Sequence, residues 1–81
     1  MSLNFDAKEV FIVMRSKGSP SKVRVYLDDE VRYLGVDSKD GVVIVDSDRL
    51  YKLINLPIAG QHILRMEFED ENAELYAFTF G

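Results

Sequence analysis

A regular period of two runs through the last twenty residues of the chain, from His62 to Gly81. Apolar residues alternate with charged residues in 64–69, and aromatic residues occupy every second position in 76–80. A short acidic link at 70–72 separates the two runs. Because a period of two places successive side chains on opposite faces of an extended strand, each run predicts a β-strand. Two such runs with a short polar link between them predict a β-hairpin.

Upstream, runs rich in β-branched residues predict further short strands. The expected strands are Lys8–Arg15, Lys22–Asp28, a short return strand at Val31–Leu34, Val42–Val45 and Arg49–Leu56. A turn is expected at Asp28–Asp29, and polar loops are expected at 16–21 and 35–41. The first of these strands has apolar residues on both faces, which is typical of a strand that is covered on both sides or has a second partner surface.

The segment Arg49–Leu56 fits a helix nearly as well as a strand, because its leucines and isoleucine follow a mixed spacing. We favour a strand because Pro57 and Gly60 would close the segment within eight residues. The residues from Pro57 to Gly60 are then expected to form the turn into the final hairpin.

Short strands at a spacing of about ten residues are typical of an antiparallel sandwich. We therefore predict an all-β fold, an antiparallel β-sandwich of jelly-roll type. The predicted core consists of Val10, Ile12, Val23, Val25, Leu27, Leu64, Met66, Phe68, Phe78 and Phe80.

The length, net charge and composition of the chain argue against several classes of function. The 81 residues suffice for one small domain. The net charge of −4 disfavours nucleic-acid binding, because an acidic surface repels phosphates. The absence of cysteine excludes thiol redox chemistry within this chain. No apolar run approaches the ~20 residues that a membrane-spanning helix needs. No paired carboxylates or glycine-rich phosphate loop indicate catalysis, so we do not expect an enzyme.

Three segments carry a resemblance to a known family: 22–28 (KVRVYLD), 40–57 (DGVVIVDSDRLYKLINLP) and 62–81 (HILRMEFEDENAELYAFTFG). The strongest signals are the Asp-Arg-Leu-Tyr run at 48–51 and the closing Tyr-Ala-Phe-Thr-Phe-Gly at 76–81. The chain resembles the C-terminal domain of DipZ-type thioredoxin-like proteins. In that family, a thioredoxin-fold domain is followed by a small β-sandwich that resembles carbohydrate-binding modules.

The resemblance implies a non-catalytic accessory domain whose partners are the thioredoxin-fold domain of the same parent chain and a neutral glycan. It assigns any thiol–disulfide oxidoreductase activity to the parent protein, and it implies an extracytoplasmic location in the periplasm or cell envelope. Residues 1–3 are interpreted as added sequence, and residues 4–81 as the single domain at the C-terminus of a longer protein.

The candidate ligand-binding residues are Tyr26, Tyr33 and Tyr51, with Arg24 and Arg49 close to them in sequence. The apolar C–H face of a sugar stacks on an aromatic ring, and a tyrosine adds a hydrogen-bonding hydroxyl. The alternative is that these tyrosines pack on the flank of the sandwich or against the thioredoxin-fold domain.

The other polar candidates have structural interpretations. His62, the one histidine, is expected to be a hydrogen-bonded structural residue, because a single histidine without cysteines makes a poor transition-metal site. Asp37, Asp40, Asp46 and Asp48 are interpreted as solvated turn residues, with a calcium site as the alternative. No cofactor is expected.

Two functional hypotheses stay open at this point. A sugar-binding domain needs at least two of the tyrosines in one open groove. A structural or docking module, which would position the thioredoxin domain or mediate association, should instead present a flat apolar patch.

Overall fold

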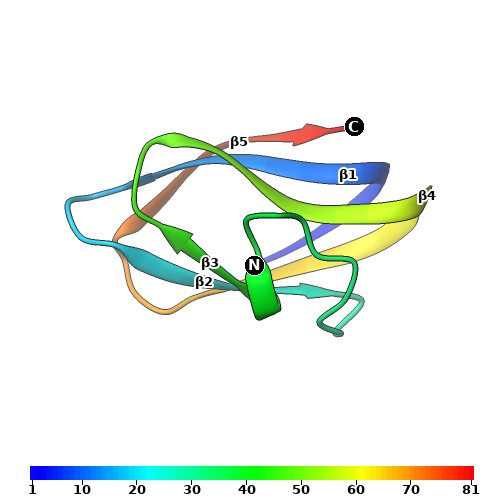
Figure 1. Ribbon diagram of the computed structural model, residues 1–81, viewed down its shortest axis with the longest axis horizontal. Helices are drawn as coiled ribbons and strands as arrows, with labels where there is room; N and C mark the ends of the chain where they lie inside the picture. The colour runs from blue at the N-terminus through cyan, green and yellow to red at the C-terminus, as the bar shows by residue number, and fades with distance from the viewer.

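The chain forms five antiparallel strands in a single sheet with the order β3-β2-β4-β1-β5. The computed structural model describes residues 1–81 (Figure 1). Its elements are β1 (Ser2–Ser16), β2 (Ser21–Leu27), a short 3-10 helix η1 (Lys39–Gly41), β3 (Val42–Val45), β4 (Arg49–Phe68) and β5 (Ala73–Phe80). The predicted all-β, antiparallel class is confirmed, and the strand predicted from Arg49 is confirmed over the helix.

The two longest strands, β1 and β4, fold the sheet over on itself. Residues 2–7 of β1 pair with residues 60–65 of β4, and residues 9–14 pair with 49–55. Between these ladders one residue of β1 lies opposite four residues of β4, 56–59. Such a bulge bends a strand pair, and Figure 1 shows both strands turning back at the same end of the molecule. The sheet therefore closes into two facing layers, as in a β-sandwich.

The predicted turn at Pro57–Gly60 is wrong, because these residues belong to β4. Pro57 lies in the bulge, where a missing N–H interrupts no ladder hydrogen bond. Gly60 already pairs with Ala7 in the second half of the strand. The Pro and Gly therefore mark a bend inside one strand.

The predicted final hairpin is also wrong, because β4 and β5 are not neighbours. The end of β4 pairs with β2, whereas β5 pairs with β1. Residues 69–72 connect β4 to β5. The Asp70 carboxylate stabilises this link by accepting hydrogen bonds from the Ser21 hydroxyl (2.7 Å) and the Asn72 N–H (2.8 Å). The alternation of apolar and polar residues identified the two strands correctly, but β5 pairs with β1 and not with β4.

The segment predicted as a return strand, Val31–Leu34, forms part of a loop instead. Three main-chain hydrogen bonds tie residues 33–37 to the outer edge of β4: Asn55 N–H to Tyr33 O (2.8 Å), Gly35 N–H to Leu53 O (2.7 Å) and Asp37 N–H to Lys52 O (3.2 Å). The loop therefore covers that edge of the sheet. The turn predicted at Asp28–Asp29 is confirmed, and both residues have the positive φ of a type I′ turn, 50° and 62°.

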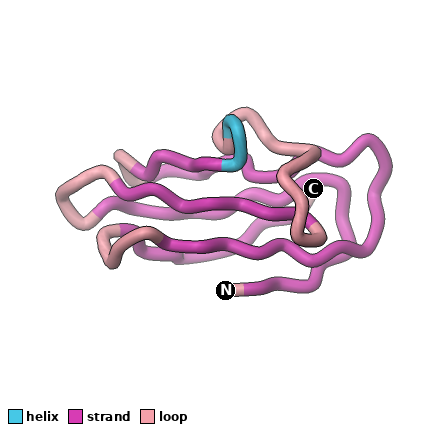
Figure 2. The backbone as a smooth tube through the Cα atoms, turned by 90° about the horizontal axis from the view of Figure 1, so that it is seen from below, coloured by secondary structure: helices cyan, strands magenta, loops and turns pink.

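The core lies between the two layers and is formed by sixteen buried side chains. Seven of the ten predicted core residues are among them: Val10, Ile12, Val23, Val25, Leu27, Leu64 and Met66. Figure 2 shows the strands running along the length of the molecule, with the 3-10 helix on one side.

The three predicted phenylalanines are not fully buried. Phe68 and Phe78 are half-buried, and Phe80 is 45% exposed. Phe78 and Phe80 lie on β5, an edge strand, so one side of each ring has no neighbouring strand. Their place in the core is taken by β4, which buries Tyr51, Leu53, Ile54 and Leu56.

Candidate functional site

Tyr51, predicted to be an exposed ligand-binding residue, is fully buried, so that prediction is wrong. Its hydroxyl donates a hydrogen bond to the Ser47 carbonyl (2.7 Å) and accepts from the N–H groups of Asp46 (3.3 Å) and Ser47 (3.2 Å). A buried tyrosine hydroxyl needs such partners. Tyr51 therefore fixes the turn between β3 and β4 from inside the core.

Arg49 packs on the ring of Tyr51 and forms an ion pair with Asp37. Its guanidinium lies 3.9 Å from the ring centroid, and Nη2 donates to Asp37 Oδ1 at 3.1 Å. Asp37 also accepts the Lys52 N–H at 2.8 Å. Partial burial acts to raise the pKa of Asp37, but the hydrogen bonds from Arg49 and Lys52 outweigh it and the pKa is lowered. These groups fasten the loop 33–37 to β4.

The other predicted residues lie elsewhere. Arg24 and Tyr26 share the outer face of β2, where Arg24 pairs with Glu69 (3.3 Å) and Arg65 lies 4.2 Å from the centroid of the Tyr26 ring. Tyr33 is 44% exposed in the loop after β2, with a positive φ of 53°. The structure therefore does not bring the three tyrosines into one groove, and none of the five predicted residues lines a cavity.

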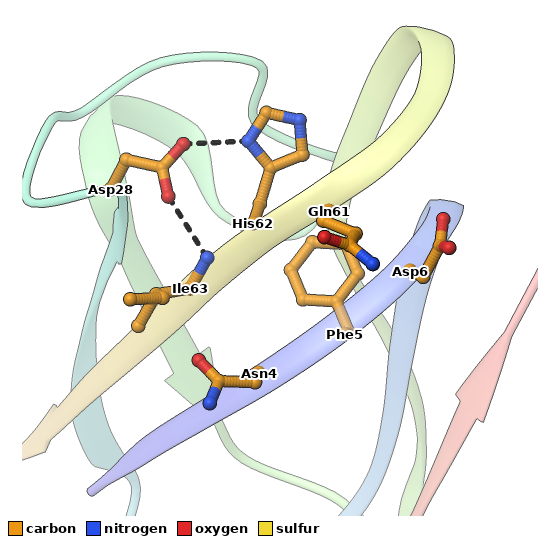
Figure 3. Close-up of a pocket in the computed structure, with 7 residues that line it drawn as sticks. All are labelled: Asn4, Phe5, Asp6, Asp28, Gln61, His62 and Ile63. Carbon is orange, nitrogen blue, oxygen red and sulfur yellow. Dashed lines mark hydrogen bonds and ion pairs between the residues drawn. The ribbon is translucent and has the colours of Figure 1, made fainter.

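The larger of two surface cavities lies where the first half of β1 meets the second half of β4 (Figure 3). It has a volume of about 600 Å³ and is open to solvent. Its lining residues are Asn4, Phe5, Asp6, Asp28, Gln61, His62 and Ile63. We call it the polar cavity, because five of the seven carry hydrogen-bonding side chains.

An Asp–His pair lines part of the polar cavity. The Asp28 carboxylate contacts His62 Nδ1 at 2.6 Å and accepts the Ile63 N–H at 2.9 Å (Figure 3). Asp28 lies in the β-turn after β2, and its positive φ suits a short polar residue. The hydrogen bond with His62 lowers the pKa of Asp28, and the Ile63 N–H adds to this effect. His62 is thus hydrogen-bonded, as predicted, at the rim of a cavity that the sequence analysis missed.

The lowered pKa of Asp28 predicts a pH-dependent contribution to stability. A carboxyl whose folded pKa is depressed contributes stability above its unfolded pKa, about 3.9, and loses it as the pH falls through the folded value. Asp28→Asn keeps the turn, since asparagine also tolerates positive φ. We expect the variant to be less stable than the wild type at pH 6, with a difference that shrinks toward pH 2. Urea unfolding across this range is the measurement, and a pH-independent difference would contradict it.

Three other residues that line the polar cavity have side chains without protein partners. Asn4, Asp6 and Gln61 are exposed and make no side-chain hydrogen bond or ion pair within the chain. Phe5 is buried and lies 6.0 Å, centroid to centroid, from the His62 ring. The free side chains of Asn4, Asp6 and Gln61 offer hydrogen-bonding groups to a small polar ligand.

A second surface feature is an apolar area on the outside of the β4-β1-β5 layer. Val13 pairs with Leu50 on one side and with Ala77 on the other, and these three side chains point away from the core with Phe11. Leu50 is 43% exposed, and nearby Val36 is 77% exposed. A cavity of about 180 Å³ lies between Phe11 and Val36. We call this surface, formed by Phe11, Val13, Val36, Leu50 and Ala77, the apolar face.

The structure contains no group of three or more His, Asp or Glu side chains placed to hold a metal ion. The turn aspartates therefore do not converge on a shared site. None of the helices is long and apolar enough to cross a membrane.

The fold and these two surfaces describe a small all-β module without cysteine. The chain belongs to the thioredoxin-like C-terminal domain family, whose model matches residues 1–81. The comparison with curated proteins and the comparison with solved structures found no match.

Proposed function

We propose that this domain is a non-catalytic accessory module that docks through its apolar face onto the thioredoxin-like domain of the same parent chain. The observation that carries the proposal is the apolar face itself. β1 buries Val10, Ile12 and Met14 in the core and still presents Phe11 and Val13 on its outer side. Apolar residues on both faces are typical of a strand that is covered on both sides.

The family description indicates which domain would cover the apolar face. A thioredoxin-like C-terminal domain is, by its description, attached to a thioredoxin-like protein. Tethering raises the effective concentration of a neighbouring domain to about millimolar for a short linker, so a weak apolar interface is sufficient. Interfaces between domains of one chain are typically small, about 600–1,500 Å². Because this chain has no cysteine, we assign any thiol chemistry of the parent chain to that neighbour.

A matched pair of variants tests the docking proposal. Leu50 and Ile44 are 43% and 44% exposed, but only Leu50 belongs to the apolar face, whereas Ile44 lies on β3. We expect Leu50→Asp to weaken binding to the thioredoxin-like domain, added in trans, by about tenfold or more, because a buried unpaired carboxylate opposes association. Ile44→Asp should leave binding unchanged. Equal effects of the two variants, measured by calorimetry, would refute the assigned surface.

We propose, as a second candidate function, that the polar cavity weakly binds a neutral glycan. The supporting observation is that Asn4, Asp6 and Gln61 line this cavity with side chains that have no partner in the chain, since planar amides and carboxylates are suited to sugar hydroxyls. A shallow open site buries little ligand, so affinity should be near millimolar. Together with glycan binding, we propose the extracytoplasmic location that the family resemblance implies.

Titration of the ¹⁵N-labelled domain with neutral oligosaccharides tests the glycan proposal. Shifts at Asn4 and Gln61 that disappear in Gln61→Ala are the expected result. An unchanged spectrum at tens of millimolar sugar would eliminate this function and leave the docking proposal untouched.

A further inference from the structure

β5 forms a long edge of the sheet that nothing in the chain covers. The edge of β4 is bonded by the loop 33–37, β3 has only four residues, and the free edge of β1 at residues 2–7 carries the charged Asp6. β5 has eight residues, pairs with β1 alone, and contains a single charged residue, Glu74. Proteins usually protect such edges with charges, proline or a covering segment. The final four residues of β5 have none of these.

The hydrogen-bond pattern shows which groups of β5 point away from the sheet. Glu9 and Gly81 exchange both of their main-chain hydrogen bonds, at 3.0 and 3.3 Å. Bonded and non-bonded pairs alternate along an antiparallel ladder. Thr79 therefore bonds to Phe11, and the N–H and C=O groups of Phe78 and Phe80 face outward, where the chain provides no partner.

We propose that this edge pairs with the same edge of a second copy, so that two sheets join through antiparallel β5 strands. A strand is the occupant that main-chain N–H and C=O groups recognise, and identical edges satisfy a two-fold axis. In the register centred on Thr79, Phe78 of each copy lies opposite Phe80 of the other. The outward groups of both residues then form bonded pairs, and Thr79 meets itself across a non-bonded pair.

The side chains are compatible with this register. Phe78 and Phe80 lie on the same face of β5, with ring centroids 6.3 Å apart, and Phe80 also lies 6.1 Å from Phe5. Pairing would place four phenylalanine rings together and cover the exposed part of Phe80. Glu74 lies outside the paired residues, so the negative charges of two copies do not meet at this edge. Cross-strand aromatic pairs stabilise such a contact.

Cysteine substitution gives a direct test, because the chain has no cysteine of its own. Directly opposed residues of a non-bonded pair have Cα atoms about 4.5 Å apart, within the range of a disulfide. Thr79→Cys should therefore form a covalent dimer rapidly under oxidised glutathione. Ala77→Cys, exposed on the same face of β5, would lie more than about 10 Å from its copy and should form no covalent dimer under the same conditions.

Sedimentation of the cysteine-free protein provides the second measurement. We expect the mass to double with rising concentration. Phe80→Pro removes an outward N–H and should raise the dissociation constant about tenfold more than Phe80→Ala, which keeps it. Circular dichroism is the control for the folding of both variants. A monomer at millimolar concentration, or equal crosslinking of the two cysteine variants, would overturn the proposal. Binding of β5 to the thioredoxin-like domain in place of a second copy would overturn it as well.

Discussion

Tyr51→Ala is expected to remove most of the free energy of unfolding of the domain at room temperature. Tyr51 is the largest fully buried side chain, and its hydroxyl makes three hydrogen bonds to residues 46 and 47. Removal of a buried aromatic ring costs about 3–5 kcal/mol. A domain of this size has a free energy of unfolding of only about 5 kcal/mol.

Tyr51→Phe separates the hydroxyl from the ring. This variant keeps the ring but leaves the turn groups without their partner, which should cost about 1–3 kcal/mol. Tyr26→Phe is the matched control, because the Tyr26 hydroxyl makes no hydrogen bond within the chain and its ring is half-buried. Denaturant unfolding of the three variants gives the comparison. A loss of stability for Tyr26→Phe as large as that for Tyr51→Phe would contradict the assigned role.

The second large effect is expected at Gly35. A Cβ atom at this buried position would overlap the Lys52 carbonyl oxygen and lie 2.7 Å from the Lys52 carbonyl carbon. Both atoms belong to the backbone of β4, which cannot move without breaking the hydrogen bond from Gly35 N–H to Leu53 O (2.7 Å). Gly35→Ala should therefore cost about 1–3 kcal/mol or more and release the loop from β4.

Gly60→Ala is the matched control for the Gly35 variant. The nearest atom to a Cβ at Gly60 is the tip of the His62 ring, at 3.4 Å, which is an ordinary contact. We expect little change in its midpoint of thermal unfolding. Hydrogen exchange should show Gly35→Ala, and not Gly60→Ala, exposing the amides of Gly35 and Asn55. Unaltered exchange in Gly35→Ala would show that the loop is not held by this contact.

The sequence predicts the strands of this fold better than it predicts their partners. The period of two identified β2 and the second half of β4, because each buries one face. It could not reveal that β1 lies between β4 and β5, since pairing between distant strands leaves no local pattern. Pro57 and Gly60 predicted a turn because proline and glycine are common in turns. In the structure they mark a bulge within β4, where four residues lie opposite one residue of β1.

The candidate site was harder to predict for the same reason. Asp28 and His62 are 34 positions apart, and only the pairing of β2 with β4 brings them together. Tyr51 lies between Leu50 and Lys52 and close to Arg49, and these charged residues suggest exposure. In the structure, Tyr51 and Leu53 alternate with exposed residues and point into the core, and the bulge at Leu53 then shifts the inward positions to Ile54 and Leu56.

The apolar face had a visible signal in the sequence. Phe11 and Val13 alternate with the core residues of β1. This pattern of apolar residues on both faces of the strand predicts a second partner surface. The structure adds Leu50, Val36 and Ala77 to that surface.

Mapping the contact between this domain and the thioredoxin-like domain of its parent chain tests the docking claim most directly. The ¹⁵N-labelled domain is titrated with the unlabelled partner, and amide shifts are assigned residue by residue. The account predicts that the largest shifts occur at Phe11, Val13, Leu50 and Ala77. Shifts confined to the outer face of β2 and β3, or a spectrum unchanged at millimolar partner, would contradict it.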